Sequence, residues 1–139
     1  MAVEIRIMKA NDYARALNLW QSLPGLGLSK ADEKNAIQDF LGKNPTTCFV
    51  AQDSDRIIGT VLGGSDGRRG YLYHLAVHKD YQHLGLGRQL TDICLSALKS
   101  QGIQKCHIFV ISSNLEGIQF WSKLGWLLRK DIHVMSKDL

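Results

Sequence analysis

Apolar residues recur along the chain with two different spacings, and each spacing predicts a type of secondary structure. In segment 3–8 every second residue is apolar, as in a half-buried strand. In segment 86–98 the apolar residues fall three and four positions apart, as on one face of a helix. The same test along the chain predicts strand 3–8, helices 13–23 and 30–41, strands 47–52, 56–62 and 71–78, helix 86–101, strand 105–112, helix 114–124 and strand 126–135.

The connections between these elements predict how the strands pair. Turn-forming residues separate the second, third and fourth strands, at 53–55 and at 63–70, so these three strands are expected to pair antiparallel. A helix joins strand 71–78 to strand 105–112, which predicts a parallel, right-handed crossover. The expected fold class is therefore α/β of the α+β type with a mixed central sheet. No linker or repeat interrupts residues 1–139, which predicts a single domain.

The composition is that of an ordinary globular domain, with 45% hydrophobic and 22% charged residues among 139. The first residues contain Glu4 and Arg6 where a signal peptide needs an apolar run, so a cytoplasmic location is expected, with no membrane partner. Cys48, Cys94 and Cys106 form no Cys-x-x-Cys pair, which favours buried thiols over a disulfide framework or a zinc site.

The positive charge lies in the second half of the chain. Residues 67–130 carry nine Lys or Arg against three Asp or Glu, and this excess suits an anionic ligand. Adjacent basic residues are few, with Arg68 and Arg69 as one such pair, and aromatic residues do not alternate with basic ones, so nucleic acid is not the expected partner. A metal site is not expected either, because His74 and His78 would stand ~13 Å apart on a strand.

Segment 77–88 places two glycines between the end of a strand and the start of a helix. The N–H groups of a first helical turn have no partner within the helix, and glycine lets a phosphate approach them. A P-loop is excluded because no Gly-Lys-Ser or Gly-Lys-Thr occurs, and a dinucleotide-binding motif lacks its third glycine at Leu90. Gln82, Gly85 and Gly87 fit another phosphate pattern, Gln/Arg-x-x-Gly-x-Gly/Ala; a tight turn that only packs the helix on the sheet is the structural alternative.

With two further motifs, the chain resembles the GNAT superfamily of N-acetyltransferases. These motifs are Gly-Thr-Val at 59–61 and Asn-Leu-Glu-Gly-Ile-Gln-Phe-Trp-Ser-Lys-Leu-Gly-Trp at 114–126. The resemblance covers the chain from Ile5 to Trp126. Segment 63–70 further resembles a small bacterial group that includes YpeA.

The resemblance implies a mixed sheet in which strands 71–78 and 105–112 splay apart and hold acetyl-CoA as the acetyl donor. The loop amides would bind its pyrophosphate, and the strand backbone would bind its pantetheine. The Val77 N–H would polarise the thioester carbonyl, and Tyr73 falls where many relatives carry a carboxylate that relays the proton of the amine. The cofactor-binding residues implied are Leu75, Ala76, Val77, Gln82, His83, Leu84, Gly85, Leu86, Gly87, Arg88, Asn114 and Trp121.

Four positions depart from the family pattern or admit a second interpretation. His83 and Leu84 replace the common Gly and Lys/Arg, so a phosphate-pairing cation is missing, which Arg88 is close enough to replace. Trp121 replaces the usual general-acid tyrosine, and an indole has no proton to give usefully. Asn114 fits a helix N-cap as well as a cofactor contact.

The function expected from these residues is transfer of an acetyl group to a primary amine by direct attack, without a metal and without an acyl-cysteine. Because Trp121 replaces the tyrosine, a non-catalytic acyl-CoA sensor is an alternative, and a nucleic-acid binder using Arg68 and Arg69 is another. The acceptor stays open among amino acids, polyamines, aminoglycosides and protein N-termini. A homodimer is common in the family and is left open here.

Overall fold

The computed structural model describes residues 2–139. The chain divides into two compact units, one ending at Ile108 and one comprising Phe109–Leu139, and each is described by itself. In the described chain no helix has both the length and the apolar character needed to span a bilayer.

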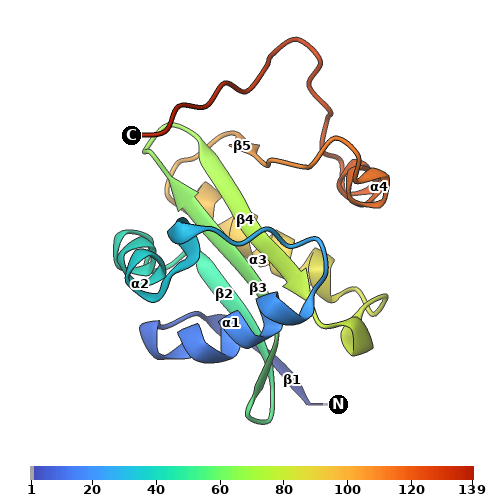
Figure 1. The fold of residues 1–139 in the computed structure, drawn as a ribbon. Helices are drawn as coiled ribbons and strands as arrows, with labels where there is room; N and C mark the ends of the chain where they lie inside the picture. The colour runs from blue at the N-terminus through green and yellow to red at the C-terminus, as the bar shows by residue number, and fades with distance from the viewer. Residues whose placement is uncertain (1) are drawn as a thin grey trace. The chain divides into compact units, whose positions relative to one another are not determined.

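The first unit is a five-stranded sheet between helices (Figure 1). The strands lie in the order β1-β2-β3-β4-β5; the first four pair antiparallel and β4 and β5 pair parallel. In Figure 1, α1 and α2 lie in front of the sheet and α3 behind it. The elements are β1 (Val3–Ile7), α1 (Tyr13–Ser22), α2 (Lys34–Lys43), β2 (Cys48–Asp53), β3 (Arg56–Ser65), β4 (Gly70–Val77), α3 (Leu86–Ser100) and β5 (Cys106–His107), with 3-10 turns η1 (Ala10–Asp12), η2 (Lys30–Asp32) and η3 (Lys79–Tyr81). These bounds confirm the mixed sheet that the sequence predicts.

The core forms where the apolar faces of the helices meet the sheet. On α3 the residues spaced three and four apart, Leu90, Cys94 and Leu98, are all buried. Strand β3 is buried along nearly its whole length, because helices cover both of its faces. Gly63 on this strand leaves no room for a side chain, since a Cβ would lie 2.5 Å from the Thr47 carbonyl oxygen.

A buried carboxylate fixes the start of α1. Asp12 is 1% exposed and receives two hydrogen bonds of 2.8 Å from the Arg6 guanidinium. Arg15 donates a third bond of 2.7 Å, and the Lys9 N–H a fourth of 2.8 Å. Burial raises the pKa of Asp12, but the hydrogen bonds from Arg6 and Lys9 and the charges of Arg6 and Arg15 outweigh it, so the net pKa is lowered.

Strand β4 contains a bulge at His74. Thr60 pairs with Ala76 and Leu62 with Tyr73, so two residues of β4 oppose one residue of β3. His74 has φ +47°, in the left-handed region. The bulge shifts the alternation of side chains, and Tyr73 and His74 consequently both contact rings on the side of α1 and α2.

The second unit contains α4 (Leu115–Lys123) and irregular chain after it. Asn114 caps this helix, with its side-chain oxygen accepting from the Gly117 N–H at 3.0 Å. The described residues after α4 form no strand, so the strand predicted over 126–135 is wrong, and the strand predicted over 105–112 is reduced to Cys106–His107. Residues with β propensity form a strand only where a neighbouring strand supplies a hydrogen-bonding partner, and the described pairing of β5 with β4 ends at His107.

Candidate active site

The glycine loop joins the end of β4 to α3 through the turn η3. The His78 imidazole Nδ1 accepts from the Asp80 N–H at 3.1 Å, and the Tyr81 hydroxyl donates to Asp53 on β2 at 2.5 Å. The Gln82 side chain donates from Nε2 to the Val77 carbonyl oxygen at 2.9 Å. Side chains therefore hold both ends of the turn, and the loop that follows starts from a fixed position.

Helix α3 begins without a side-chain cap. Its N-cap is Gly85, with φ +83°, a conformation that glycine adopts without strain. The first bond of the helix runs from the Gln89 N–H to the Gly85 carbonyl at 3.1 Å. The N–H groups of Leu86, Gly87 and Arg88 precede that bond and have no carbonyl partner within the helix.

These amides fit the pyrophosphate group that the sequence suggests. A Cβ built on Gly85 would meet nothing within 4 Å, so the approach to the helix start is open. No acidic side chain lies in the first turn of α3, and the positive end of the helix dipole is therefore not compensated there. The arrangement can bind an anion through the main chain.

The side chains of the loop differ in what they can add. His83, Leu84 and Arg88 are exposed, whereas Leu86 is buried and can offer only its backbone. His83 has φ +64°, so a histidine occupies a left-handed conformation where the family commonly has glycine. Arg88 forms an exposed ion pair with Asp92, one turn further along α3, with Nε 3.8 Å from Oδ2.

The outer edge of β4 leaves main-chain groups for a second contact. The His78 N–H bonds the Ile58 carbonyl at 2.8 Å, and Ala76 pairs with Thr60, so both residues direct their polar groups at β3. Leu75 and Val77 alternate with them and direct theirs away from β3. Strand β5 pairs only with Gly70 and Tyr71, so within the first unit it does not reach these positions. The pair is splayed in the way the sequence predicts.

Tyr73 lies on β4 beside the rings of Tyr71 and Phe40. Its ring is stacked on Tyr71 at 6.5 Å and meets Phe40 of α2 edge to face at 6.2 Å. Its side chain is 39% exposed. Burial, and to a smaller degree Tyr71, raises the pKa of Tyr73 above its ordinary value of 10.0. The phenol is therefore protonated at neutral pH and is poorly suited to accept a proton.

His74 lies on the same side of the sheet as Tyr73, although strict alternation predicts the opposite side. Its ring lies 4.8 Å from that of Trp20 on α1, and its Nε2 lies 2.6 Å from Oδ1 of Asp32. The bulge explains the difference, because an extra residue in β4 reverses the alternation after it. Sequence reasoning missed Asp32 as a site residue, since nothing local marks an aspartate 42 positions away as a partner.

The three thiols are poor nucleophiles. Burial raises the pKa of Cys48 to about 11 and that of Cys94 to about 12. Cys106 is partly exposed, and burial raises its pKa as well. Thiols with such values carry almost no thiolate at neutral pH. Among residues 2–139 no three His, Cys, Asp or Glu side chains are grouped so as to hold a metal ion.

Asn114 and Trp121 belong to the second unit. Asn114 caps α4 as described, which agrees with the structural interpretation of that residue. Trp121 packs edge to face against Phe120 at 5.2 Å and against Trp126 at 5.1 Å. The Trp126 N–H also bonds the Trp121 carbonyl at 3.0 Å. Within its own unit, Trp121 is a packing residue at the end of a helix.

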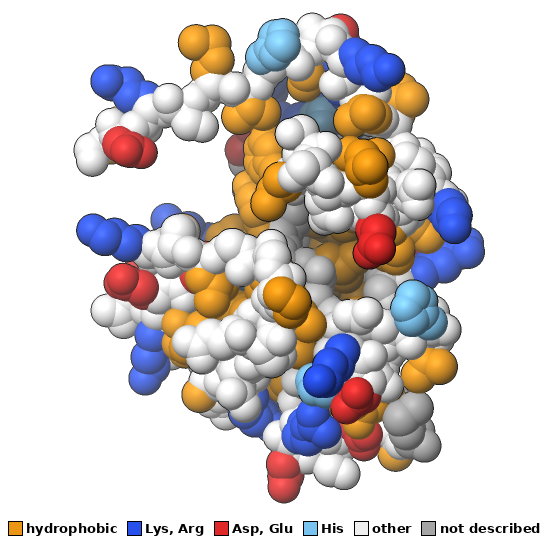
Figure 2. All heavy atoms as spheres, turned by 45° about the vertical axis from the view of Figure 1, so that its right-hand side comes forward, with side chains coloured by type: hydrophobic (Ala, Val, Ile, Leu, Met, Phe, Trp, Pro, Cys, Tyr) orange, Lys and Arg blue, Asp and Glu red, His pale blue; other side chains and the backbone are white. Residues whose placement is uncertain are grey.

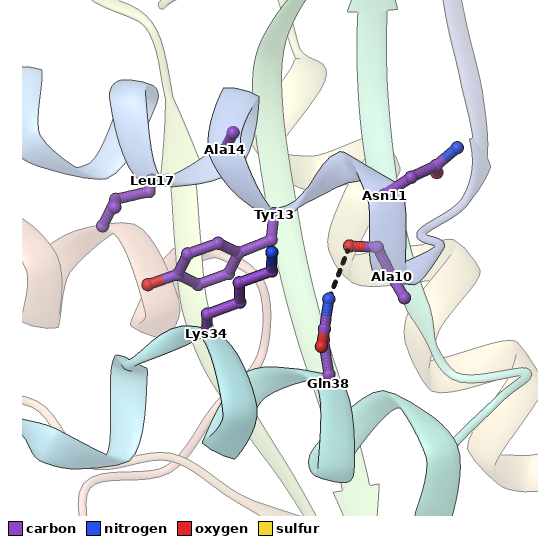
Figure 3. A pocket seen from close by; sticks show the side chains of 7 residues that line it. All are labelled: Ala10, Asn11, Tyr13, Ala14, Leu17, Lys34 and Gln38. Atoms are coloured by element: carbon purple, nitrogen blue, oxygen red, sulfur yellow. Dashed lines mark hydrogen bonds between the residues drawn. The ribbon is translucent and has the colours of Figure 1, made fainter.

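Two surface features complete the picture. A groove between α1 and α2 is lined by Ala10, Asn11, Tyr13, Ala14, Leu17, Lys34 and Gln38 (Figure 3). None of these is a residue that the sequence selected, so the groove and the predicted site do not coincide. Figure 2 shows Lys and Arg side chains interspersed with neutral and acidic ones.

Comparison with known proteins agrees with the geometry of the loop and the sheet. The acetyltransferase (GNAT) family matches residues 12–126. An acetyltransferase of Pectobacterium atrosepticum is 32% identical over 124 residues, which cover 89% of this chain and 87% of that protein.

Solved structures share the fold. Ard1 from Thermoplasma volcanium superposes with a TM-score of 0.81 at 21% identity, covering 93% of this chain and 85% of that one. The PaiA N-acetyltransferase from Thermoplasma acidophilum, solved with coenzyme A, gives 0.80 at 18% identity, covering 95% and 94%. The narrower resemblance to the YpeA-like group stays a prediction. The chain belongs to the acetyltransferase (GNAT) family and is an N-acetyltransferase.

Proposed function

We propose that the protein transfers the acetyl group of acetyl-CoA to a primary amine by direct attack in a ternary complex. The observation that carries the proposal is the pairing of two main-chain sites in one unit. The open start of α3 offers amides to a pyrophosphate, and the edge of β4 at Leu75 and Val77 offers groups to a pantetheine amide. The coenzyme A in the PaiA structure supports the choice of donor.

The Val77 N–H is the proposed oxyanion contact. It points away from β3 at the last residue of the strand, and the Gln82 side chain fixes the same peptide region through the Val77 carbonyl. A rigid N–H stabilises the charge that develops on the thioester oxygen as the nitrogen attacks. Asn114 and Trp121 are proposed as further cofactor contacts from the second unit, on the strength of the family motif.

Direct attack needs no acyl-enzyme. The new C–N bond forms as the thioester C–S bond breaks, and the departing thiol has an ordinary pKa of about 8.5, so it leaves readily as a thiolate. The raised pKa values of Cys48 and Cys94 support a route without an enzyme nucleophile.

The test is a thiol-release screen with acetyl-CoA and a panel of amines: an amino-acid amide, spermidine, an aminoglycoside and a peptide with a free N-terminal alanine. We expect at least one amine to be acetylated, with intersecting double-reciprocal lines when both substrates are varied. Parallel lines, or an acetyl-cysteine in the mass spectrum that turns over with the amine, would contradict direct attack. Tight binding of acetyl-CoA without acetylation of any amine would favour the sensor.

A further inference from the structure

Two titratable side chains, far apart in sequence, meet beside the edge of β4. Nε2 of His74 and Oδ1 of Asp32 are 2.6 Å apart, and the two side chains are 15% and 12% exposed. Asp32 ends the turn η2 before α2, and His74 is the bulged residue of β4. The pair therefore joins the connection between α1 and α2 to the strand that carries Leu75 and Val77.

Further hydrogen bonds hold both Asp32 and His74 in position. The second oxygen of Asp32, Oδ2, accepts from the Ser29 N–H at 2.9 Å, and the Tyr13 hydroxyl donates to the Asp32 carbonyl at 2.7 Å. The His74 carbonyl accepts from the Thr60 hydroxyl at 2.8 Å. These bonds limit the freedom of both groups, as expected of an oriented pair rather than of two mobile surface residues.

Trp20 completes the support. Its indole N–H donates to the Thr60 hydroxyl at 2.9 Å, and its ring lies 4.8 Å from the imidazole. Trp20 is fully buried, so the imidazole rests on a rigid apolar surface. Figure 3 shows Tyr13 extending its hydroxyl from the first turn of α1, the same helix that carries Trp20.

The contact with Asp32 decides which ring nitrogen is available. An ionised carboxylate only accepts hydrogen bonds, so the proton of the neutral imidazole resides on Nε2. Nδ1 then keeps its lone pair, and among the described residues it makes no hydrogen bond. An imidazole oriented by a carboxylate through one nitrogen, with the other unprotonated, is suited to accept a proton.

We infer that His74 accepts the proton of the incoming amine, with Asp32 as its positioning residue. This inference rests on the proposed function and names the proton acceptor for it. His74 directly precedes Leu75 in the chain and belongs to the bulge of β4, which follows Tyr71, the last residue that pairs with β5. The proton acceptor and the main-chain contacts for the thioester thus come from one strand.

The proton balance is complete. The ammonium gives one proton to Nδ1 of His74, and the imidazolium that forms is paired with the Asp32 carboxylate. The free amine forms the C–N bond, the C–S bond breaks, and the thiolate takes the second proton that the nitrogen releases. Water removes the proton from His74 after the products leave.

The groups that face the imidazole are few. Asp32 comes from η2, Trp20 from α1 and Thr60 from β3, while Tyr73 is its neighbour on β4. Tyr73 is the other candidate proton acceptor, and burial keeps its phenol protonated at neutral pH. Among these groups the imidazole is the one with a nitrogen, Nδ1, that keeps its lone pair and makes no hydrogen bond to the described residues.

The simpler alternative is that the pair only ties η2 to β4. His74→Asn separates the two roles, because asparagine tolerates the left-handed backbone but does not accept a proton near neutrality. We expect kcat/KM at pH 7 to fall on the order of 10²-fold, mostly through kcat, and the acidic limb of the pH profile that belongs to the enzyme to disappear. Asp32→Asn removes the carboxylate that orients the imidazole and should lower kcat about tenfold.

Thr47→Val serves as the structural control. It removes a buried hydroxyl that donates to the Gly63 carbonyl at 2.6 Å, outside the contacts of Asp32 and His74, so it should lower the midpoint of thermal unfolding and leave the acidic limb in place. A ¹⁵N spectrum of the histidine rings at pH 8 checks the tautomer without any amine, and we expect Nδ1 of His74 to be unprotonated.

Three results would overturn the inference. A protonated Nδ1 in the neutral ring contradicts the geometry on which it rests. A His74→Asn variant that keeps the acidic limb and a kcat within twofold of the wild-type value defeats the inference and leaves acetyl transfer standing. Failure of the wild-type protein to acetylate any amine of the panel defeats the proposed function and this inference together.

Discussion

The proposed reaction site has a phosphate end, formed by main-chain groups, and an amine end, formed by side chains. The phosphate end uses main-chain N–H groups of Leu86, Gly87 and Arg88, and its side chains are mostly exposed or turned into the core. The amine end uses the side chains of Asp32 and His74, which hydrogen bonds from three elements hold in place. Under the proposed function, donor binding depends on backbone conformation, whereas proton removal depends on individual side chains.

The largest effect should come from the network that fixes α1, the helix behind the amine end. Asp12→Asn leaves the Arg6 and Arg15 guanidinium groups without their buried counter-charge, so we expect the free energy of unfolding at pH 7 to fall by about 2–3 kcal/mol. Because the pKa of Asp12 is lowered in the folded state, its stabilisation is complete above the ordinary value of 3.8 and is lost as the pH falls through the lowered pKa.

Denaturant titrations at pH 7 and at pH 3 check this. The deficit of Asp12→Asn should be full at pH 7 and smaller at pH 3. Asp66→Asn is the control, since that carboxylate is exposed and accepts only from the N–H groups of Arg68 and Arg69. Equal deficits for the two variants would show that burial of Asp12 has no special effect.

The second prediction concerns a substitution that disturbs only the phosphate end of the site. Gly85→Val forces a β-branched residue into φ +83° at the start of α3 and should weaken CoA binding at least tenfold, about 1.4 kcal/mol or more. Gly102→Val is a matched control, because Gly102 has φ +89° and, like Gly85, open space around it. Both variants should unfold at a lower temperature, but only the first should lose the thermal shift produced by CoA. Gly85→Ala provides a milder second variant.

A smaller effect is expected from the side chain at the same helix start. Arg88→Gln should weaken CoA binding about threefold in low salt and less at high ionic strength, because an exposed charge is screened. Lys99→Gln, in the last turn of α3, removes a charge of the same sign from the other end of the helix. Titration calorimetry at two salt concentrations compares them, and equal losses would show that only net charge matters.

The smallest effect is expected at Trp121. The indole has no proton to donate, and its contacts are with Phe120 and Trp126, so Trp121→Phe should keep turnover within about twofold. Turnover and CoA affinity are measured together with the unfolding midpoint. Loss of turnover with the other two values unchanged would assign Trp121 a role in the reaction, and Trp121→Tyr would then be the informative second variant.

The contrast between the two ends also explains what the sequence predicts and what it does not. Gly85 and Gly87 mark the phosphate end because a left-handed backbone and open amides leave a local pattern, and the long helix after them has a regular apolar face. The amine end leaves no such pattern. The bulge at His74 reverses the alternation of β4, and its partner Asp32 arrives through tertiary packing.

Strand pairing limits the prediction in a second way. Strands β1 to β4 follow the apolar pattern because each finds a neighbour in the sheet. Segments 105–112 and 126–135 are also rich in residues with high β propensity. A strand forms only beside a neighbouring strand, however, and the apolar spacing of a single sequence does not reveal whether that neighbour is present.

The most direct test of the account is an amide ¹H–¹⁵N titration of the full chain with CoA. The account predicts the largest shifts at the N–H groups of Leu86, Gly87 and Arg88 and at Leu75 and Val77 on β4, with Gly102 unchanged at the far end of α3. Saturating shifts confined to other residues, with these five amides unaffected, would contradict the claim that the main chain of this loop and strand holds the acetyl donor.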